Sequence, residues 1–454
     1  MRLFEWRCLV ISSLLLSAAV AETRPQYGGT LHIAMQSAPT TLDPADASQP
    51  ASIARGNLTL LMFETLVTMD ENGRPRPALA ASWVASPGNH RWQFRLRHGI
   101  KFHDGTPLTA EAGAASLRAA NPTWNVSAEG DSVVIEREAA DPEMPAELAM
   151  PRNAIVKRSS SGQPSGTGPF HIVDWQPGKK LTLAAEESHW RGRPFLDGIE
   201  VEMGKSYRDQ MTALELGKTD WVEVPAEQAH RASLEGRRLA SSAPVELLAL
   251  LFAREAASPE EKMLREVLAL SIDRSSIRSV LLQGAGQPAG GVLPDWISGY
   301  GFVFPTDADL PRARHERDQV RKVPVWTLGY DASDPIARVL AERIALNAKD
   351  GGLSLQPTTA ATADVRVVRV ALASAAPWVA LASIAALSGL SSTKEGGSAE
   401  DLYSAEQALL ATERIIPLFH LPAAYAASAQ LKNWNLRPDG SCSLADAWLG
   451  SGKP

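Results

Sequence analysis

Residues 91–111 read "RWQFRLRHGIKFHDGTPLTAE", and this stretch decides the fold around it. Apolar and polar residues alternate over 92–96, which is typical of a half-buried β-strand. Asp104 and Gly105 then favour a tight turn. Thr109 has a side chain that can cap a following helix. The stretch therefore predicts a strand, a turn and the start of a helix.

The neighbours His103 and Asp104 also suggest a catalytic or metal-binding pair. Adjacent side chains at the end of a strand point to opposite faces, so they converge poorly on one substrate atom. Glu111 lies in the first turn of the predicted helix, where its negative charge interacts favourably with the positive N-terminus of that helix. We therefore interpret the pair as part of a turn.

Length and composition indicate a protein with several lobes. A chain of 454 residues is too long for one hydrophobic core and predicts two or three lobes. Hydrophobic residues make up 44% and charged residues 21%, as in ordinary globular chains. The net charge of -6 provides no broad basic surface, so no nucleic-acid partner is expected.

The first residues, "MRLFEWRCLVISSLLLSAAVAET", have the pattern of a signal peptide. We predict that residues 1–21 are cleaved off after Ala21 and that the mature protein is periplasmic. An uncleaved membrane anchor is the alternative. After cleavage Cys442 is the only cysteine, which excludes an intramolecular disulfide and a cysteine-ligated metal cluster.

Mixed α and β patterns continue along the chain. We expect a helix over 58–66 and one long amphipathic helical pattern over 259–283. Residues 305–324 are charged and flanked by prolines, which predicts an exposed connection. The remaining strong patterns predict strands at 28–35, 131–138, 180–186 and 221–224, with a helix that closes near Gly217 before the last of these.

Motifs for chemistry are weak. "GKS" at 204–206 and "GKT" at 217–219 lack the glycine five residues earlier that a phosphate-binding loop needs. The sequence has no H-E-x-x-H and no G-x-S-x-G motif. Histidines occur singly in different elements. We therefore predict no catalytic residue, no metal site and no cofactor. Of the 12 tryptophans, most should pack in cores and some can line a cleft.

The order of several segments, rather than any one of them, is distinctive. The chain resembles the family 5 extracellular solute-binding proteins, the oligopeptide- and dipeptide-binding components of ABC importers. The segments that carry the resemblance are "GGTLHIAM...TLDPA", "FETLVTMDENGRPRPALAASW", "WQFRLRHGIKFHDGTPLTAE", "GTGPFHIVDWQPGKKLTL", "HWRGRPFLDGIEVEM", "ALELGKTDWVEVP", "LREVLALSIDR" and "IIPLFHLPAAY", between residues 28 and 425.

The resemblance implies a non-enzymatic binding protein with a two-lobed α/β fold of the periplasmic-binding-protein type. It implies a monomer that closes over a peptide-like or other small solute and delivers it to ABC permease subunits. A sensing or interaction protein on the same fold, without a transport role, is the alternative. The implied boundaries are 22–41, 164–243 and 428–454 for the core of lobe I, 42–163 for an inserted subdomain, and 244–427 for lobe II.

The chain departs from the family in the segment "VALASAAPW". Val370 and Ala373 stand where the family has a tryptophan and an aspartate that pairs with the free amine of a peptide. A buried ammonium without a partner is costly, so the ligand need not be a peptide. The residues that the resemblance places near the ligand are Ser48, Gln49, Trp378, Phe419 and His420.

Overall fold

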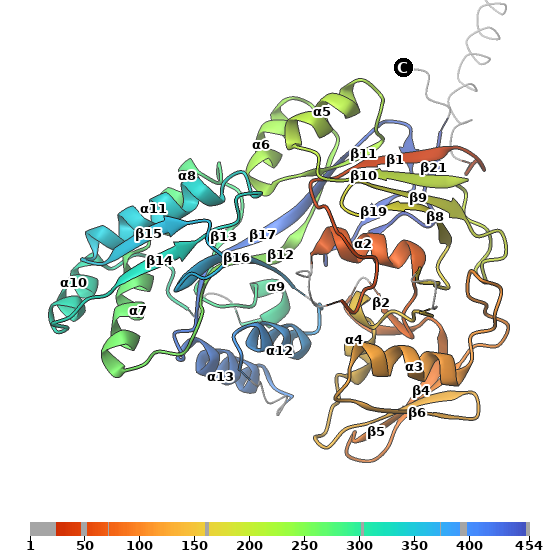
Figure 1. Cartoon of the computed structure of the whole chain (residues 1–454), viewed down its shortest axis with the longest axis horizontal. Helices are drawn as coiled ribbons and strands as arrows, with labels where there is room; N and C mark the ends of the chain where they lie inside the picture. The colour runs from red at the N-terminus through yellow and green to blue at the C-terminus, as the bar shows by residue number, and fades with distance from the viewer. Residues whose placement is uncertain are drawn as a thin grey trace, which may run out of the picture.

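The computed structural model describes residues 24–46, 52–70, 72–158, 163–300, 304–372, 374–390 and 397–450. The predicted signal peptide at 1–21 lies outside these residues. The described chain folds into two α/β lobes that share one continuous sheet (Figure 1). None of its described helices is long and apolar enough to cross a bilayer.

Lobe I is built on the part of this sheet centred on β1, which pairs in parallel with both of its neighbours. Helix α2 (Ile53–Met62) packs its Leu58 and Leu61 into the same core as Leu31 of β1. The five strands, in their order across the lobe, are β11 (Trp221–Val224), β1 (Thr30–Ala34), β10 (Gly198–Glu202), β9 (Lys180–Ala185) and β8 (Phe170–Gln176).

Two long strands connect the lobes. β12 (Leu239–Phe252) and β17 (Ile415–Ala427) pair antiparallel, and β17 also pairs with β11 of lobe I. The pairing is irregular around Pro244, which has no N–H to donate to the ladder. These strands are the only part of the sheet that both lobes share among the described residues, so they are the natural hinge.

Lobe II encloses β12 between two layers of helices. Alternate side chains of its apolar run pack in two different cores, with Leu248 and Leu250 on one face and Leu247 and Ala249 on the other. β16 (Val365–Ala371), β14 (Val325–Gly329) and β15 (Ser354–Thr358) extend the sheet, and β13 (Gln287–Pro288) pairs with β17. One face carries α7 (Pro259–Ser271), α8 (Arg274–Val280), α10 (Leu310–Asp318) and α11 (Ala337–Asp350), and the other α9 (Asp295–Ser298), α12 (Pro377–Leu387) and α13 (Ala399–Leu410).

Three expected elements differ in the structure. The pattern over 259–283 is two helices, because Asp273 accepts a hydrogen bond from the backbone N–H of Ser276 and caps a new helix, α8. Part of 305–324 is helix α10 rather than a connection. The helix expected over 58–66 is α2, which Ser52 caps and which ends before the extended Phe63.

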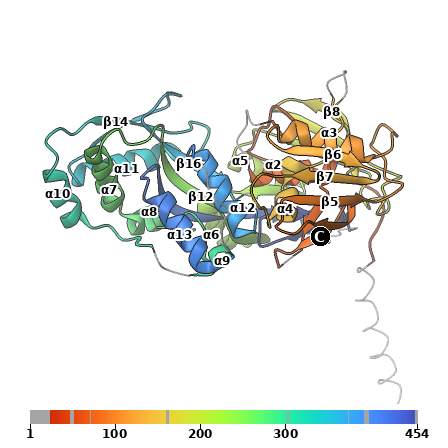
Figure 2. The ribbon, with the colours of Figure 1, turned by 90° about the horizontal axis from the view of Figure 1, so that it is seen from below.

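An inserted subdomain follows α2 in the chain and has its own core. In Figure 2 its strands and α3 face the viewer. Its secondary structure consists of β2 (Val67–Met69), β3 (Pro75–Pro77), β4 (Ala80–Ala85), β5 (Arg91–Leu96), α3 (Ala110–Ala120), β6 (Asn125–Glu129), β7 (Ser132–Glu136), α4 (Met144–Leu148) and a 3-10 turn at Pro151–Asn153.

The strand, turn and helix predicted for 91–111 are confirmed. Residues 91–96 form β5, and Gly105 has a left-handed φ of 81°. Thr109 caps α3 by accepting from the backbone N–H of Ala112. Burial alone would raise the pKa of Asp104, but Lys157, at 2.5 Å, and Thr106 lower it to about 2.

The last described residues return to lobe I and pack on its core through Leu431, Trp434 and Leu444. They form two short antiparallel pairs, β18 (Leu431–Lys432) with β21 (Trp448–Leu449) and β19 (Asn435–Leu436) with β20 (Cys442–Ser443). The turn between β19 and β20 reaches the cleft between the lobes.

Candidate functional site

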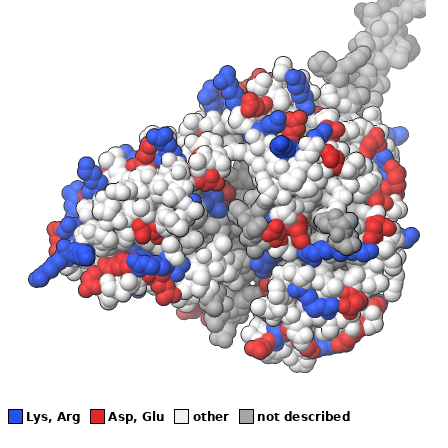
Figure 3. All heavy atoms as spheres, in the orientation of Figure 1, with Lys and Arg blue, Asp and Glu red and all other residues white. Residues whose placement is uncertain are grey.

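Two cavities lie between the lobes, and the surface is visibly hollowed there (Figure 3). We call the first the apolar pocket and the second the polar cavity. They share Ile53 and Arg55 of α2 and Val245 of β12. Their volumes are about 1160 Å³ and about 2200 Å³, including space open to solvent.

The apolar pocket has walls from both lobes. Ile53 and Leu60, seven residues apart on α2, lie on one face of that helix and line the pocket together with Met150. Leu372 and Trp296 line it from lobe II. A solute in this pocket would therefore contact both lobes at once.

A turn of the C-terminal segment, residues 437–441, forms another wall of the apolar pocket. Gly440 has a left-handed φ of 78°, and a Cβ there would lie 3.1 Å from Val245 and 3.2 Å from Ile53. Glycine therefore suits both the conformation and the close approach. Arg437 and Asp439 are carried into the pocket wall by this turn.

Buried Asn57 fastens that turn to α2. Its Nδ2 donates to the carbonyl of Gly440 and to the hydroxyl of Tyr425, each at 3.3 Å. Its Oδ1 accepts from the backbone N–H of Cys442 at 2.9 Å. Burial raises the pKa of Cys442 to about 12, so this free thiol stays protonated.

Trp296 is fixed at the edge of the apolar pocket. Its Nε1 donates to the carbonyl of Pro244 at 2.7 Å, and the residue remains 38% exposed. The preceding loop is held by Glu406, which accepts from the N–H groups of Val292 and Leu293 and from the hydroxyl of Tyr300. Burial raises the pKa of Glu406 even though these hydrogen bonds act to lower it. An aromatic side chain held in this way offers a rigid apolar surface.

The polar cavity is lined by charged groups. From lobe II, Arg369 pairs with Asp334 at 2.7 Å and with Glu246 at 3.1 Å. Burial alone would lower the pKa of Arg369, but attraction by these carboxylates raises it. From lobe I, Glu223 accepts from backbone N–H groups of residues 36 and 37, and burial raises the pKa of Glu223 and of Glu227.

The lobes also contact each other on both flanks of the cleft. At the polar cavity, Nε2 of Gln36 donates to the carbonyl of Ser333 at 3.2 Å. At the apolar pocket, Ala146 and Met150 of lobe I pack in one small core with Val379 of α12. In the described structure the two lobes therefore contact each other beside both cavities.

The residues expected near the ligand are dispersed. Ser48, Gln49 and the substituted Ala373 lie outside the described residues. Trp378 is only 6% exposed in a core of lobe II. It is not among the described residues that line the two cavities.

Phe419 and His420 lie on β17 and are buried at 0% and 5% exposure. His420 lies 3.2 Å from the carbonyl of Val292, and burial lowers its pKa to about 4. Neither residue is among the described lining of the two cavities, and Val370 packs partly buried on β16. A contact of Trp378, Phe419 or His420 with ligand stays a prediction.

Three histidines that are far apart in the sequence gather between the subdomain and lobe I. His103 bonds to the carbonyl of Gly168 at 2.9 Å, and its ring centre lies 6.0 Å from that of His171. Burial lowers the pKa of His103, with His171 and His189 among the nearby charges. Even so, no group of three or more His, Cys, Asp or Glu side chains in the described residues could hold a metal ion.

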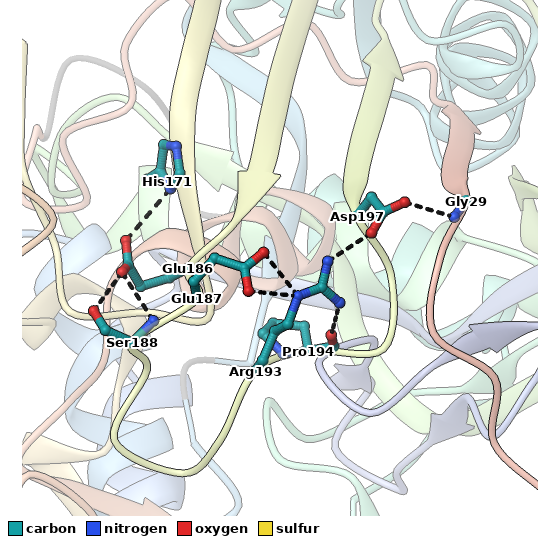
Figure 4. Close-up of polar contacts among 8 residues, drawn as sticks. All are labelled: Gly29, His171, Glu186, Glu187, Ser188, Arg193, Pro194 and Asp197. Carbon is teal, nitrogen blue, oxygen red and sulfur yellow. Dashed lines mark hydrogen bonds and ion pairs between the residues drawn. The ribbon is translucent and has the colours of Figure 1, made fainter.

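The segment "HWRGRPFLDGIEVEM", one of those that carry the family resemblance, begins in the loop between β9 and β10 (Figure 4). Arg193 pairs with Glu187 at 2.8 Å and with Asp197 at 2.6 Å. Asp197 also accepts from the backbone N–H of Gly29 at 3.1 Å, just before β1. These contacts fasten the loop to the first strand and do not reach either cavity.

Residues 74–369 match the family described as bacterial extracellular solute-binding proteins, family 5. The chain belongs to this family. The family comprises solute-binding proteins and is described as extracellular. The match confirms the resemblance drawn from the order of segments.

Two curated relatives illustrate the range of the family. The nickel-binding protein NikA of Staphylococcus aureus is 26% identical over 306 residues, which are 64% of this chain. The oligopeptide-binding protein AppA of Bacillus subtilis is 22% identical over 336 residues, or 68% of this chain. The matched stretch spans 61% of the length of each relative.

Solved structures confirm the two-lobed family 5 fold. AppA of Bacillus subtilis, in complex with a nonapeptide, has a TM-score of 0.77 at 17% identity, covering 94% of this chain and 100% of that one. DppA of Helicobacter pylori, in complex with the peptide STSA, has a TM-score of 0.78 at 18% identity, covering 94% and 99%. At such identities the likeness concerns the fold alone.

Proposed function

We propose that the protein is an extracytoplasmic solute-binding protein that captures a peptide-like or other small solute between its lobes and delivers it to the permease of an ABC transporter. The observation that carries the proposal is the apolar pocket, whose walls come from both lobes and from hinge strand β12. The relatives named as nickel-binding and oligopeptide-binding support it.

The proposed mechanism is a population shift between open and closed arrangements. A solute that contacts Leu60 in lobe I and Leu372 in lobe II binds the closed arrangement more tightly than the open one. The permease then recognises closure rather than the solute itself. No covalent bond of the solute changes in this cycle, and one protein molecule acts alone.

We further propose that secretion depends on residues 1–21 as a signal peptide. The proposed units are 22–41, 164–243 and 428–454 for the core of lobe I, 42–163 for the subdomain and 244–427 for lobe II. The separate core of β4 to β7 with α3 supports the subdomain. The crossing of β12 and β17 supports a boundary near the hinge.

Closure can be measured as a distance between spin labels. Glu111→Cys on α3 and Glu400→Cys on α13 place labels on exposed positions far from the hinge in Figure 1. Cys442 should react slowly with the label, because it is only partly exposed and burial raises the pKa of its thiol to about 12. Native mass spectrometry of gently purified protein supplies the candidate solute.

We expect the distance distribution to shorten and narrow when the co-purified solute is added back to stripped protein. Transport additionally requires that the closed protein stimulates ATP hydrolysis by a neighbouring permease and ATPase reconstituted in vesicles. Closure without stimulation would favour a sensing role. An unchanged distance with every retained solute would contradict capture between the lobes.

A further inference from the structure

The charges around the apolar pocket are unbalanced, and this bears on the solute. Among its described lining residues the acidic side chain is Asp439, whereas three arginines line the same pocket: Arg55, Arg152 and Arg437. The carboxylate of Asp439 already accepts from the backbone N–H and the hydroxyl of Ser441, at 2.9 and 2.6 Å. The pocket is therefore electropositive.

Arg437 is the arginine whose charge is least compensated. Its Nη1 donates to the backbone carbonyl of Met69 at 3.3 Å, and it forms no ion pair within the part of the chain that the structure describes. A guanidinium group has five N–H donors in a planar fork that suits a carboxylate. The half-buried Arg437 is held in place by the turn that Asn57 and Gly440 secure.

The other two arginines add positive charge but have partners in the protein. Arg152 pairs with Glu147 at 3.1 Å and is about half exposed. Arg55 donates to the carbonyls of Asp43 and Asp46, at 2.7 and 3.2 Å. Because both already have partners in the protein, neither is available as the main anchor for a solute.

Apart from one serine, the described residues that line the rest of the pocket near lobe II are apolar. Its described residues between 371 and 375 are two alanines, a leucine and a serine. Met69 and Met150 supply adaptable apolar surface, and Trp296 a rigid one. Among the described lining residues, the carboxylate available to a free amine is that of Asp439, whose Oδ1 already accepts two hydrogen bonds.

We infer that the apolar pocket takes an apolar organic acid, with its carboxylate on Arg437 and its hydrocarbon body against Trp296 and Met150. This inference rests on the proposed function and names the class of solute. A carboxylic ester has no negative charge to pair with the guanidinium group of Arg437, and an amine carries a positive charge of its own. Neither would neutralise the guanidinium. Acids are therefore distinguished from amines of the same shape.

The test compares probes that differ only in the charged group. Octanoate and phenylpropionate are titrated against octylamine and phenylpropylamine by calorimetry and by tryptophan fluorescence, with Trp296→Phe identifying the signal of this residue. We expect the acids to bind and the amines to bind at least about tenfold more weakly. Equal binding of an amine, or no binding of either acid, would overturn the inference.

Two pairs of variants locate the interaction. Arg437→Gln should weaken binding of the acids about tenfold or more, whereas Arg231→Gln, on an exposed position of α6 (Ala226–Leu234), should leave it unchanged. Ala375→Asp adds a carboxylate to the lining from lobe II and should weaken the acids similarly, whereas Ala375→Asn is its neutral match. The Ala375 pair keeps the test valid if removal of Arg437 prevents folding.

The closure measurement separates this inference from the proposed function. If the co-purified solute closes the lobes and is not an acid, capture stands and the solute class is wrong. If an acid binds with Arg437→Gln as well as with the natural protein, the anchor is wrong. If acids bind but the lobes do not close, the pocket is right and the transport cycle is wrong.

Discussion

Replacing Asn57 with alanine should release the turn that carries Arg437. The substitution removes the acceptor of the partly buried Cys442 N–H and the donor to the carbonyl of Gly440. The hydroxyl of Tyr425, a residue only 2% exposed, loses its hydrogen-bond donor as well. Three polar groups on two different segments, two of them in buried hydrogen bonds and one in a partly buried one, therefore lose the same partner.

The expected cost follows from these three groups. A buried group left without its partner costs roughly 1–3 kcal/mol, and two of the bonds are long at 3.3 Å and lie at the low end. We expect Asn57→Ala to lower the free energy of unfolding by about 2–4 kcal/mol. The affinity for the solute should fall too, because the position of Arg437 is no longer fixed.

Two measurements check this prediction. Urea unfolding followed by circular dichroism gives the change in stability, and hydrogen exchange of the Cys442 amide reports the turn itself, since two lobes need not unfold in one transition. Asn125→Ala, on the exposed strand β6, is the matched control and should change stability by less than about 0.5 kcal/mol. Unchanged exchange at Cys442 would refute the role assigned to Asn57.

Three further substitutions test other parts of the structure. His103→Ala should leave the solute affinity within about twofold, because the residue lies in the subdomain away from both cavities, and isothermal titration would contradict this if binding were lost in a folded variant. Arg369→Leu leaves Glu246 and Asp334 without their cation and should lower the free energy of unfolding by about 3 kcal/mol in urea titrations, whereas the exposed Arg338→Leu should change it little. The pKa of His420 is about 4 in the folded protein against about 6.5 unfolded, so the unfolded chain takes up the proton first and stability should fall by up to about 3 kcal/mol as the pH drops from 6.5 to 4. That extra loss should vanish in His420→Asn, and an identical pH profile for both proteins would rule the explanation out.

The fold was largely predictable because its signals are local. Alternation over 91–96, the turn at Gly105 and the cap at Thr109 each depend on a few neighbouring residues, and each is present in the structure. The break at Asp273 was not predicted, because α7 and α8 pack in one core and the apolar pattern continues across the residue that caps α8. Local signals therefore predict elements better than their ends.

The candidate site was hardly predictable, because its walls come from distant parts of the chain. Ile53, Trp296 and Arg437 meet at one pocket although each is more than a hundred residues from the next. The sequence "RPDGS" at 437–441 does contain a turn signal, which could have marked an exposed loop. Nothing local indicates that this turn packs against α2, because that contact depends on Asn57 and on the absent side chain of Gly440.

The limits of the family match separate the residues that build the two lobes from those that form much of the pocket wall. Residues 74–369 contain most of lobe II, most of the subdomain and much of lobe I, and they include the pocket residues Met150 and Trp296. The match leaves out the whole of α2, Thr68 and Met69, the segment 371–375 and the turn at 437–441, which form much of the pocket wall. Family membership therefore predicts how the lobes are built. The charge of the solute depends on walls outside the match, where Arg437 forms no ion pair with a described residue and Asp439 is the acidic side chain among the described lining residues of the apolar pocket.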